Sequence, residues 1–114
     1  MSGLSTHVLD TAIGRPAAGI GVRLEVEEEA GAWRELARAA TNADGRVGHL
    51  LPTGTALAAA TYRLTFDVAA YHQARGTPGF YPHVSIVFTV RDAGQHHHVP
   101  LLLSPFGYST YRGS

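Results

Sequence analysis

The stretch "IGVRLEV", residues 20–26, decides the fold class of this chain. Its apolar side chains recur at every second position, at Ile20, Val22, Leu24 and Val26. Arg23 and Glu25 occupy positions between them, so one face of the segment is apolar and the other is charged. A period of two is the period of a strand whose one face is buried. We therefore predict a half-buried β-strand here.

The same alternation appears in "TYRLTFDV", residues 61–68, and in "HVSIVFTV", residues 83–90. Weaker strand patterns cover residues 4–10, 33–41, 96–104 and 108–113. Turn signals rich in Gly, Asp, Asn or Pro separate these segments, at residues 14–19, 30–32, 42–46, 75–79 and 92–94. Only "DVAAYHQAR", residues 67–75, resembles a short helix. We expect an all-β sandwich of two antiparallel sheets with one short helix.

Length and composition favour one domain spanning residues 1–114, with one hydrophobic core. The nine basic and nine acidic side chains cancel, which disfavours nucleic acid and anionic membranes as partners. The low-charge stretch 50–62 is too short and too interrupted for a membrane helix. The start "MSGLSTHVLD" has no pattern of a secretory signal, and the chain has no cysteine, so we expect a cytoplasmic protein.

The chain has seven histidines, and three of them are consecutive at residues 96–98. On a strand, His97 shares its face with the apolar residues Val99, Leu101 and Leu103, which we expect to face the core. The opposite face then carries His96, His98, Pro100 and Leu102. Apolar residues beside two histidines on an exposed face suggest a contact surface or a pocket wall.

Three more residues could take part in chemistry with these histidines. His7 lies in the mixed pattern "STHVLD", where the alternation does not decide which side is buried. Arg46 follows the turn signal "NADG", which would present the arginine at a loop tip or at a strand start. Ser114 closes the printed sequence, and a hydroxyl and a carboxylate would both be available there if the final strand is held in place.

Two chemical schemes could combine these residues. In the first, His96 and His98 chelate a zinc ion, and a third histidine such as His7 or His49 completes the metal site. In the second, which needs no metal, a neutral imidazole takes a proton from water and an arginine stabilises the oxyanion. No zinc-hydrolase motif, nucleophile elbow or phosphate loop is present to favour another chemistry. The two schemes remain open at this level, and so does adventitious metal binding by His96 and His98.

Three stretches together resemble a known family: "LSTHVLDTAIGRPAAGI" at 4–20, "NADGR" at 42–46 and "HHHVPLLLSPFGYSTYRGS" at 96–114. They look like the 5-hydroxyisourate hydrolases, the transthyretin-like enzymes of urate degradation. The resemblance extends from Leu4 to Ser114, and the final "YRGS" is its most specific mark. One departure is His97, where the family often has tyrosine.

The resemblance implies a transthyretin-like sandwich of two four-stranded antiparallel sheets with one short helix. It also implies a homotetramer, built as a dimer of dimers, with active sites in the channel where dimers meet. The implied catalytic residues are His7, Arg46 and His98. The implied substrate-binding residues are Tyr111, Arg112, Gly113, Ser114, Pro100 and Leu102.

The implied reaction is hydrolysis of a cyclic amide bond in 5-hydroxyisourate, which gives 2-oxo-4-hydroxy-4-carboxy-5-ureidoimidazoline. No cofactor or metal is expected. As a hypothesis, His7 activates water, Arg46 stabilises the oxyanion and His98 orients the substrate or passes the proton on, although the sequence does not decide which histidine is the base. The remaining histidines, His49, His72 and His83, are interpreted as structural or surface residues.

A hormone carrier of the transthyretin type is the alternative from a different functional class, since one fold can host both functions. A carrier needs an apolar channel without a general base. The polar set of His7, Arg46 and His98 argues against it.

Overall fold

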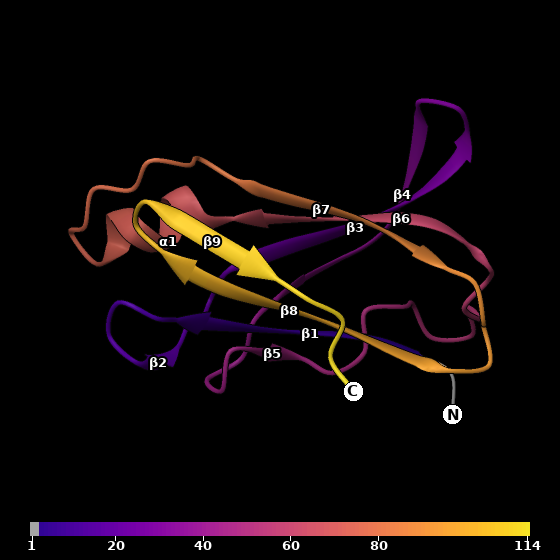
Figure 1. Cartoon of the computed structure of the whole chain (residues 1–114), viewed down its shortest axis with the longest axis horizontal. Coiled ribbons are helices and arrows are strands. Elements are labelled where there is room, and N and C mark those ends of the chain that lie inside the picture. The colour runs from indigo at the N-terminus through magenta and orange to yellow at the C-terminus, as the bar shows by residue number, and fades with distance from the viewer. Residues whose placement is uncertain (1–2) are drawn as a thin grey trace.

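The computed structural model describes residues 3–114, which form two β-sheets stacked face to face (Figure 1). The first sheet contains β1 (Gly3–Asp10), β2 (Arg15–Pro16), β5 (Arg46–Val47), β8 (His96–Ser104) and β9 (Gly107–Thr110). The second sheet contains β3 (Gly21–Glu29), β4 (Ala32–Ala40), β6 (Ala60–Asp67) and β7 (Val84–Val90). The helix α1 (Val68–Ala74) follows β6 directly, and the Asp67 side chain caps its first turn.

The all-β sandwich with one short helix is confirmed, and every strand segment expected from alternation is present. The expectation of two four-stranded antiparallel sheets holds for the second sheet, with the order β4-β3-β6-β7. The first sheet has five strands, and its central pair β1 and β8 is parallel. The strands β2 and β5 have two residues each, which is too short for alternation to reveal.

The core lies between the sheets and is built by the alternating positions of the long strands. Leu24, Leu64 and Phe66 from the second sheet are fully buried, as are Val8 and Leu101 from the first. Burying each such side chain contributes about 1.5–3 kcal/mol to folding. The inward positions predicted for residues 20–26 and 61–68 are therefore confirmed, except that Val26 is only half-buried.

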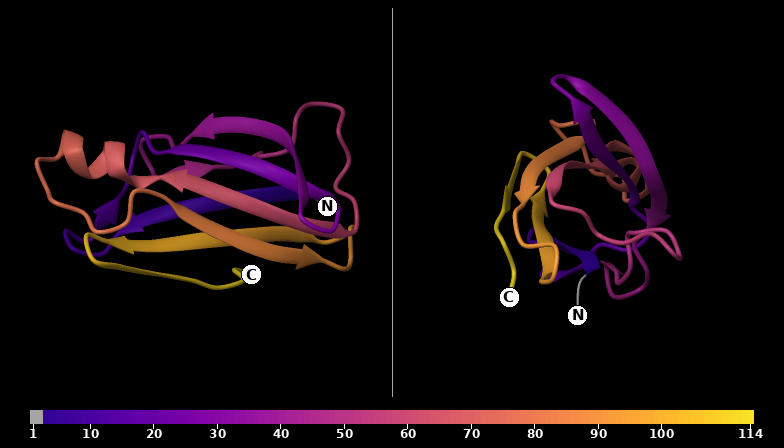
Figure 2. Two further views of the ribbon diagram at one scale, coloured as in Figure 1. Left: turned by 90° about the horizontal axis from the view of Figure 1, so that it is seen from above. Right: turned by 90° about the vertical axis from the view of Figure 1, so that its right-hand side faces the viewer.

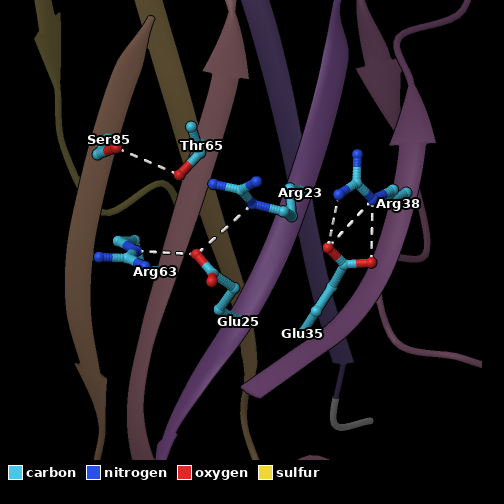
Figure 3. Close-up of polar contacts among 7 residues, drawn as sticks. All are labelled: Arg23, Glu25, Glu35, Arg38, Arg63, Thr65 and Ser85. Carbon is cyan, nitrogen blue, oxygen red and sulfur yellow. Dashed lines mark hydrogen bonds and ion pairs between the residues drawn. The ribbon is translucent and has the colours of Figure 1, made fainter. Parts of the chain in front are cut away.

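The outer face of the second sheet is an ion-paired surface (Figure 3). The carboxylate of Glu25 accepts a hydrogen bond from Arg63 Nε at 2.9 Å and lies 3.6 Å from Arg23 Nε. On the neighbouring strand β4, Arg38 and Glu35 form an ion pair with each other at 2.9 Å. A hollow of about 680 Å³ lies over this face and is lined by none of the predicted site residues.

Of the three histidines interpreted as structural or surface residues, one lies in α1 and two lie in loops. His72 is 3 % exposed in α1 against Gly79, where a Cβ would touch its ring, so its role is packing. His49 and His83 are exposed. Within residues 3–114 no helix is long and apolar enough to span a membrane.

Candidate active site

The predicted catalytic residues come together on the outer face of the first sheet because of how β1 pairs. In the parallel pairing with β8, Ser5 lies opposite His98, and in the antiparallel pairing with β5, His7 lies opposite Arg46. The sequence did not decide which face of the strand around His7 is buried. In the structure the buried face carries Leu4, Thr6 and Val8. Ser5 and His7 therefore project from the opposite face, beside β8 and β5.

The turn before Arg46 places that residue next to His7. Gly45 adopts a φ of 74°, and a Cβ there would overlap the carbonyl oxygen of Val8, so the turn requires glycine. Asn42 Oδ1 accepts hydrogen bonds from the backbone N–H groups of Asp44 at 2.9 Å and Arg46 at 3.0 Å. The same turn orients His7, because its Nε2 lies 2.9 Å from the Asp44 carbonyl oxygen. A carbonyl only accepts, so this Nε2 carries a proton.

Two close contacts hold the ring of His98. Its Nδ1 lies 2.8 Å from Ser5 Oγ. Its Cδ2 faces Gly113, where a Cβ would come within 2.6 Å of that ring carbon. The Gly113 N–H also donates to the His98 carbonyl oxygen at 2.8 Å, which ties the C-terminal segment alongside β8 (Figure 2). Within residues 3–114, no side chain or backbone group hydrogen-bonds to His98 Nε2.

Burial is the largest cause that lowers the pKa of His98 below its ordinary value, followed by the nearby charge of Arg46 and by His7 and His96. A lowered pKa keeps this imidazole neutral near pH 7. A neutral imidazole with a free ring nitrogen can accept a proton.

These residues border one open pocket of about 490 Å³. Its wall includes His7, Arg46, His98, Tyr111 and Ser114, which are five of the predicted site residues. Ser5, Thr6, Val47, Gly48 and His96 complete it. The pocket thus combines imidazoles, a guanidinium, hydroxyls and one aromatic ring.

The other predicted site residues lie outside the pocket wall. Gly113 stands behind the His98 ring, and Arg112 donates a hydrogen bond to the side chain of Gln95 at 3.0 Å. Pro100 is buried, and Leu102 is half-buried beside β9. Their assignment to substrate binding stays a prediction. The expected inward face of β8 is confirmed, since His97 is 6 % exposed and its Nδ1 contacts the Gln95 carbonyl oxygen.

Sequence reasoning missed Ser5 and the position of His96 in this site. Ser5 Oγ lies 2.7 Å from His96 Nε2 as well as 2.8 Å from His98 Nδ1. Ser5 shares the alternation of His7, which was a usable signal, but its partners are more than 90 residues away along the chain. Within residues 3–114, no three His, Cys, Asp or Glu side chains gather closely enough to hold a metal ion.

The arrangement provides the parts of metal-free hydrolysis. His98 offers a neutral ring nitrogen, Arg46 offers hydrogen-bond donors for a developing oxyanion, and Tyr111 offers a flat wall for a ring. The groups come from β1, β5, β8 and the C-terminal segment, so only the folded sheet assembles them.

Comparisons with known proteins agree with this geometry. The chain matches the HIUase/Transthyretin family over residues 4–113. It is 50 % identical to the 5-hydroxyisourate hydrolase of Mus musculus, over 99 % of this chain and 96 % of the relative. The structure of Klebsiella pneumoniae 5-hydroxyisourate hydrolase matches with a TM-score of 0.84 and 39 % identity, over 99 % of this chain and 100 % of that one. Sea bream transthyretin in complex with thyroxine matches with a TM-score of 0.87 and 29 % identity, over 96 % of this chain and 93 % of that one. This chain therefore belongs to the HIUase/Transthyretin family.

Proposed function

We propose that the protein hydrolyses 5-hydroxyisourate, opening its ring at a cyclic amide bond to form 2-oxo-4-hydroxy-4-carboxy-5-ureidoimidazoline. The observation that carries the proposal is the convergence of His7, Arg46 and His98 with Tyr111 and Ser114 in one pocket. The full-length similarity to the mouse hydrolase supports the same substrate.

The chemistry adds one water across the amide. The water oxygen bonds to the carbonyl carbon, the C–N bond breaks, one water proton ends on the leaving nitrogen, and the other leaves the new carboxyl group. Arg46 stabilises the carbonyl oxygen as it gains charge. This hydrolysis requires no cofactor.

We assign the proton from the attacking water to His98, although the sequence hypothesis gave that task to His7. His98 borders the pocket, its Nε2 has no hydrogen-bond partner among residues 3–114, and the pKa of His98 is lowered, chiefly by burial. His7 has its Nε2 proton engaged by the Asp44 carbonyl oxygen, so its ring is oriented to position the substrate. Separate substitutions of His98 and His7 can distinguish proton acceptance from substrate positioning.

The polar pocket wall favours hydrolysis over carriage of a hormone such as thyroxine. A ring-binding carrier site is mostly apolar with few polar groups. Here three histidines and an arginine occupy the wall.

The proposal includes a homotetramer assembled as a dimer of dimers. The strands β7 and β9 are free edges of the two sheets, and both lie along one side of the sandwich (Figure 2). An apolar groove bordered by Ile86, Val87, Phe88 and Thr110 runs between these edges. Free edges with apolar neighbours favour pairing with a second copy. A cytoplasmic location stays a prediction from the sequence.

The test generates 5-hydroxyisourate freshly with urate oxidase and follows its spectroscopic decay with and without the protein. We expect faster decay that survives exhaustive chelation, and a loss of about 100-fold or more in kcat for His98→Ala. The base must be neutral, and the pKa of His98 is lowered. We therefore expect kcat/KM to stay constant as the pH falls to 6.5, the ordinary pKa of imidazole, and to drop only at lower pH. Unchanged decay with the folded protein would overturn the proposal, and thyroxine binding without turnover would indicate a carrier.

A further inference from the structure

Three side chains of the pocket wall form a continuous hydrogen-bonded chain from the half-buried His98 to the exposed His96. Ser5 Oγ lies 2.8 Å from His98 Nδ1 on one side and 2.7 Å from His96 Nε2 on the other. Ser5 is only 8 % exposed, whereas His96 is exposed at the start of β8. The half-buried ring of His98 is therefore connected through one hydroxyl to an exposed imidazole.

A serine hydroxyl has one proton to donate, so the chain allows two arrangements. In the first, Ser5 donates to His98 Nδ1, and His98 then presents a protonated Nε2 to the pocket. In the second, His98 Nδ1 donates to Ser5 and Ser5 donates to His96 Nε2. His98 then presents an Nε2 lone pair to the pocket. The hydroxyl direction thus decides whether His98 faces the substrate as an acid or as a base.

Arg46 favours the second arrangement. It borders the same pocket as His98 and its positive charge acts on that ring, so an Nε2 lone pair has a lower electrostatic energy there than an Nε2–H group. Among residues 3–114, the side-chain hydrogen bond of the His96 ring is the one between Nε2 and Ser5 Oγ.

We propose that Ser5 is a positioning residue that holds His98 with Nε2 unprotonated and relays charge between His98 and His96. The inference rests on the proposed hydrolysis. When Nε2 takes a proton from water, the Nδ1 proton moves to Ser5 and the Ser5 proton moves to His96. When the leaving nitrogen takes the Nε2 proton, the relay runs back. Each step conserves protons, and the carboxyl proton leaves separately.

The relay has a physical advantage over a protonated His98. An imidazolium at His98 would be half-buried and would face the positive charge of Arg46 as well as His7. At His96 the same charge is exposed to water, which solvates it. The intermediate therefore costs less free energy with the cation at His96.

The first test compares Ser5→Ala with Ser5→Thr, which retains a hydroxyl, and with Ser104→Ala, which removes a serine hydroxyl bonded to Gly107 elsewhere on β8. We expect kcat to fall about 100-fold in Ser5→Ala with little change in KM, and to stay within about threefold in the other two. Solvent-isotope proton inventories should indicate several protons in flight for the unsubstituted protein and one for Ser5→Ala. Equal kcat and equal inventories would overturn the relay.

The second test measures the His98 tautomer by ¹⁵N NMR and does not depend on turnover. We expect an unprotonated Nε2 near pH 7 in the unsubstituted protein and a mixture of tautomers in Ser5→Ala. If that variant does not fold, His96→Gln serves instead, since His96 is exposed. A protonated Nε2 in the unsubstituted protein would overturn the inference. Absent hydrolysis by every variant would overturn only the proposed function, while the tautomer result stands on its own.

Discussion

The position of the His98 ring depends on two small residues. Ser5 contacts Nδ1, and Gly113 leaves room for the Cδ2 edge. The first contact requires a hydroxyl at position 5, and the second requires the absence of a side chain at position 113. Gly113 of "YRGS" therefore has to be glycine for a steric reason, the space needed by the His98 ring, which the sequence alone does not reveal.

Replacing Gly113 by alanine should displace the His98 ring or the C-terminal segment, because the added Cβ would come within 2.6 Å of Cδ2. We expect kcat/KM to fall about 10- to 100-fold from misplacement of the ring, measured in the decay assay. Gly107→Ala is the matched control, since its Cβ would meet only Ser104 Oγ at 3.6 Å. Full activity in Gly113→Ala would show that this contact does not position His98.

Replacing Arg46 by lysine should lower kcat about 100-fold, because an ammonium does not reproduce the planar fork of donors towards an oxyanion. The turn itself should be unaffected, since Asn42 bonds to the backbone of Arg46 and not to its side chain. Arg15→Lys, in the short exposed strand β2, is a control for loss of a guanidinium. A fully active Arg46→Lys enzyme would remove the oxyanion role.

At the scale of elements, the two sheets have separate tasks. The outer face of the first sheet carries the pocket, while the outer face of the second carries the cluster of Arg23, Glu25 and Arg63. Glu25 is the most buried member, with 12 % of its side chain exposed. The hydrogen bond from Arg63 is the largest cause that lowers its pKa, followed by burial, which opposes it.

Glu25→Gln should lower the free energy of unfolding by about 1 kcal/mol at neutral pH, because Arg23 and Arg63 then share no counter-charge. Since the pKa of Glu25 is lowered in the folded state, its stabilisation is present above the ordinary value of 4.5 and is lost as pH falls through the folded value. Urea unfolding near pH 7 and near pH 3 measures this. The difference in free energy of unfolding between Glu25→Gln and the unsubstituted protein should be smaller near pH 3. Glu28→Gln, at a pair with 54 % of the Glu28 side chain exposed, should change little.

At the scale of the whole molecule, the side of the sandwich along β7 and β9 is the surface expected to meet a second copy. The exposed Val87 and the exposed ring of Tyr108 lie on these edge strands. Main-chain pairing across both edges would extend each sheet and cover this apolar surface.

Val87→Lys should shift the mass in solution from a tetramer to smaller species, because a buried ammonium at a subunit contact is unfavourable. Native mass spectrometry or sedimentation measures the shift. Ser85→Lys, on the same face of β7 but outside the apolar groove, should leave the assembly intact. An unsubstituted protein that is monomeric at micromolar concentration would contradict the tetramer.

Much of this protein could be predicted from local sequence. Alternation located the long strands, and "NADGR" located the turn that requires Gly45, because both depend on neighbouring residues and local backbone geometry. The same local motifs indicated His7, Arg46 and His98 through a family resemblance.

Only the tertiary structure decided which distant residues meet. The parallel pairing of β1 with β8 places Ser5 between His96 and His98, and the bridge to β8 places Gly113 against His98. Strand direction and register between segments some 90 residues apart depend on how both sheets close around the shared core. A local period of two does not contain that information, so the hydrogen-bonded chain behind the pocket appears only in the folded protein.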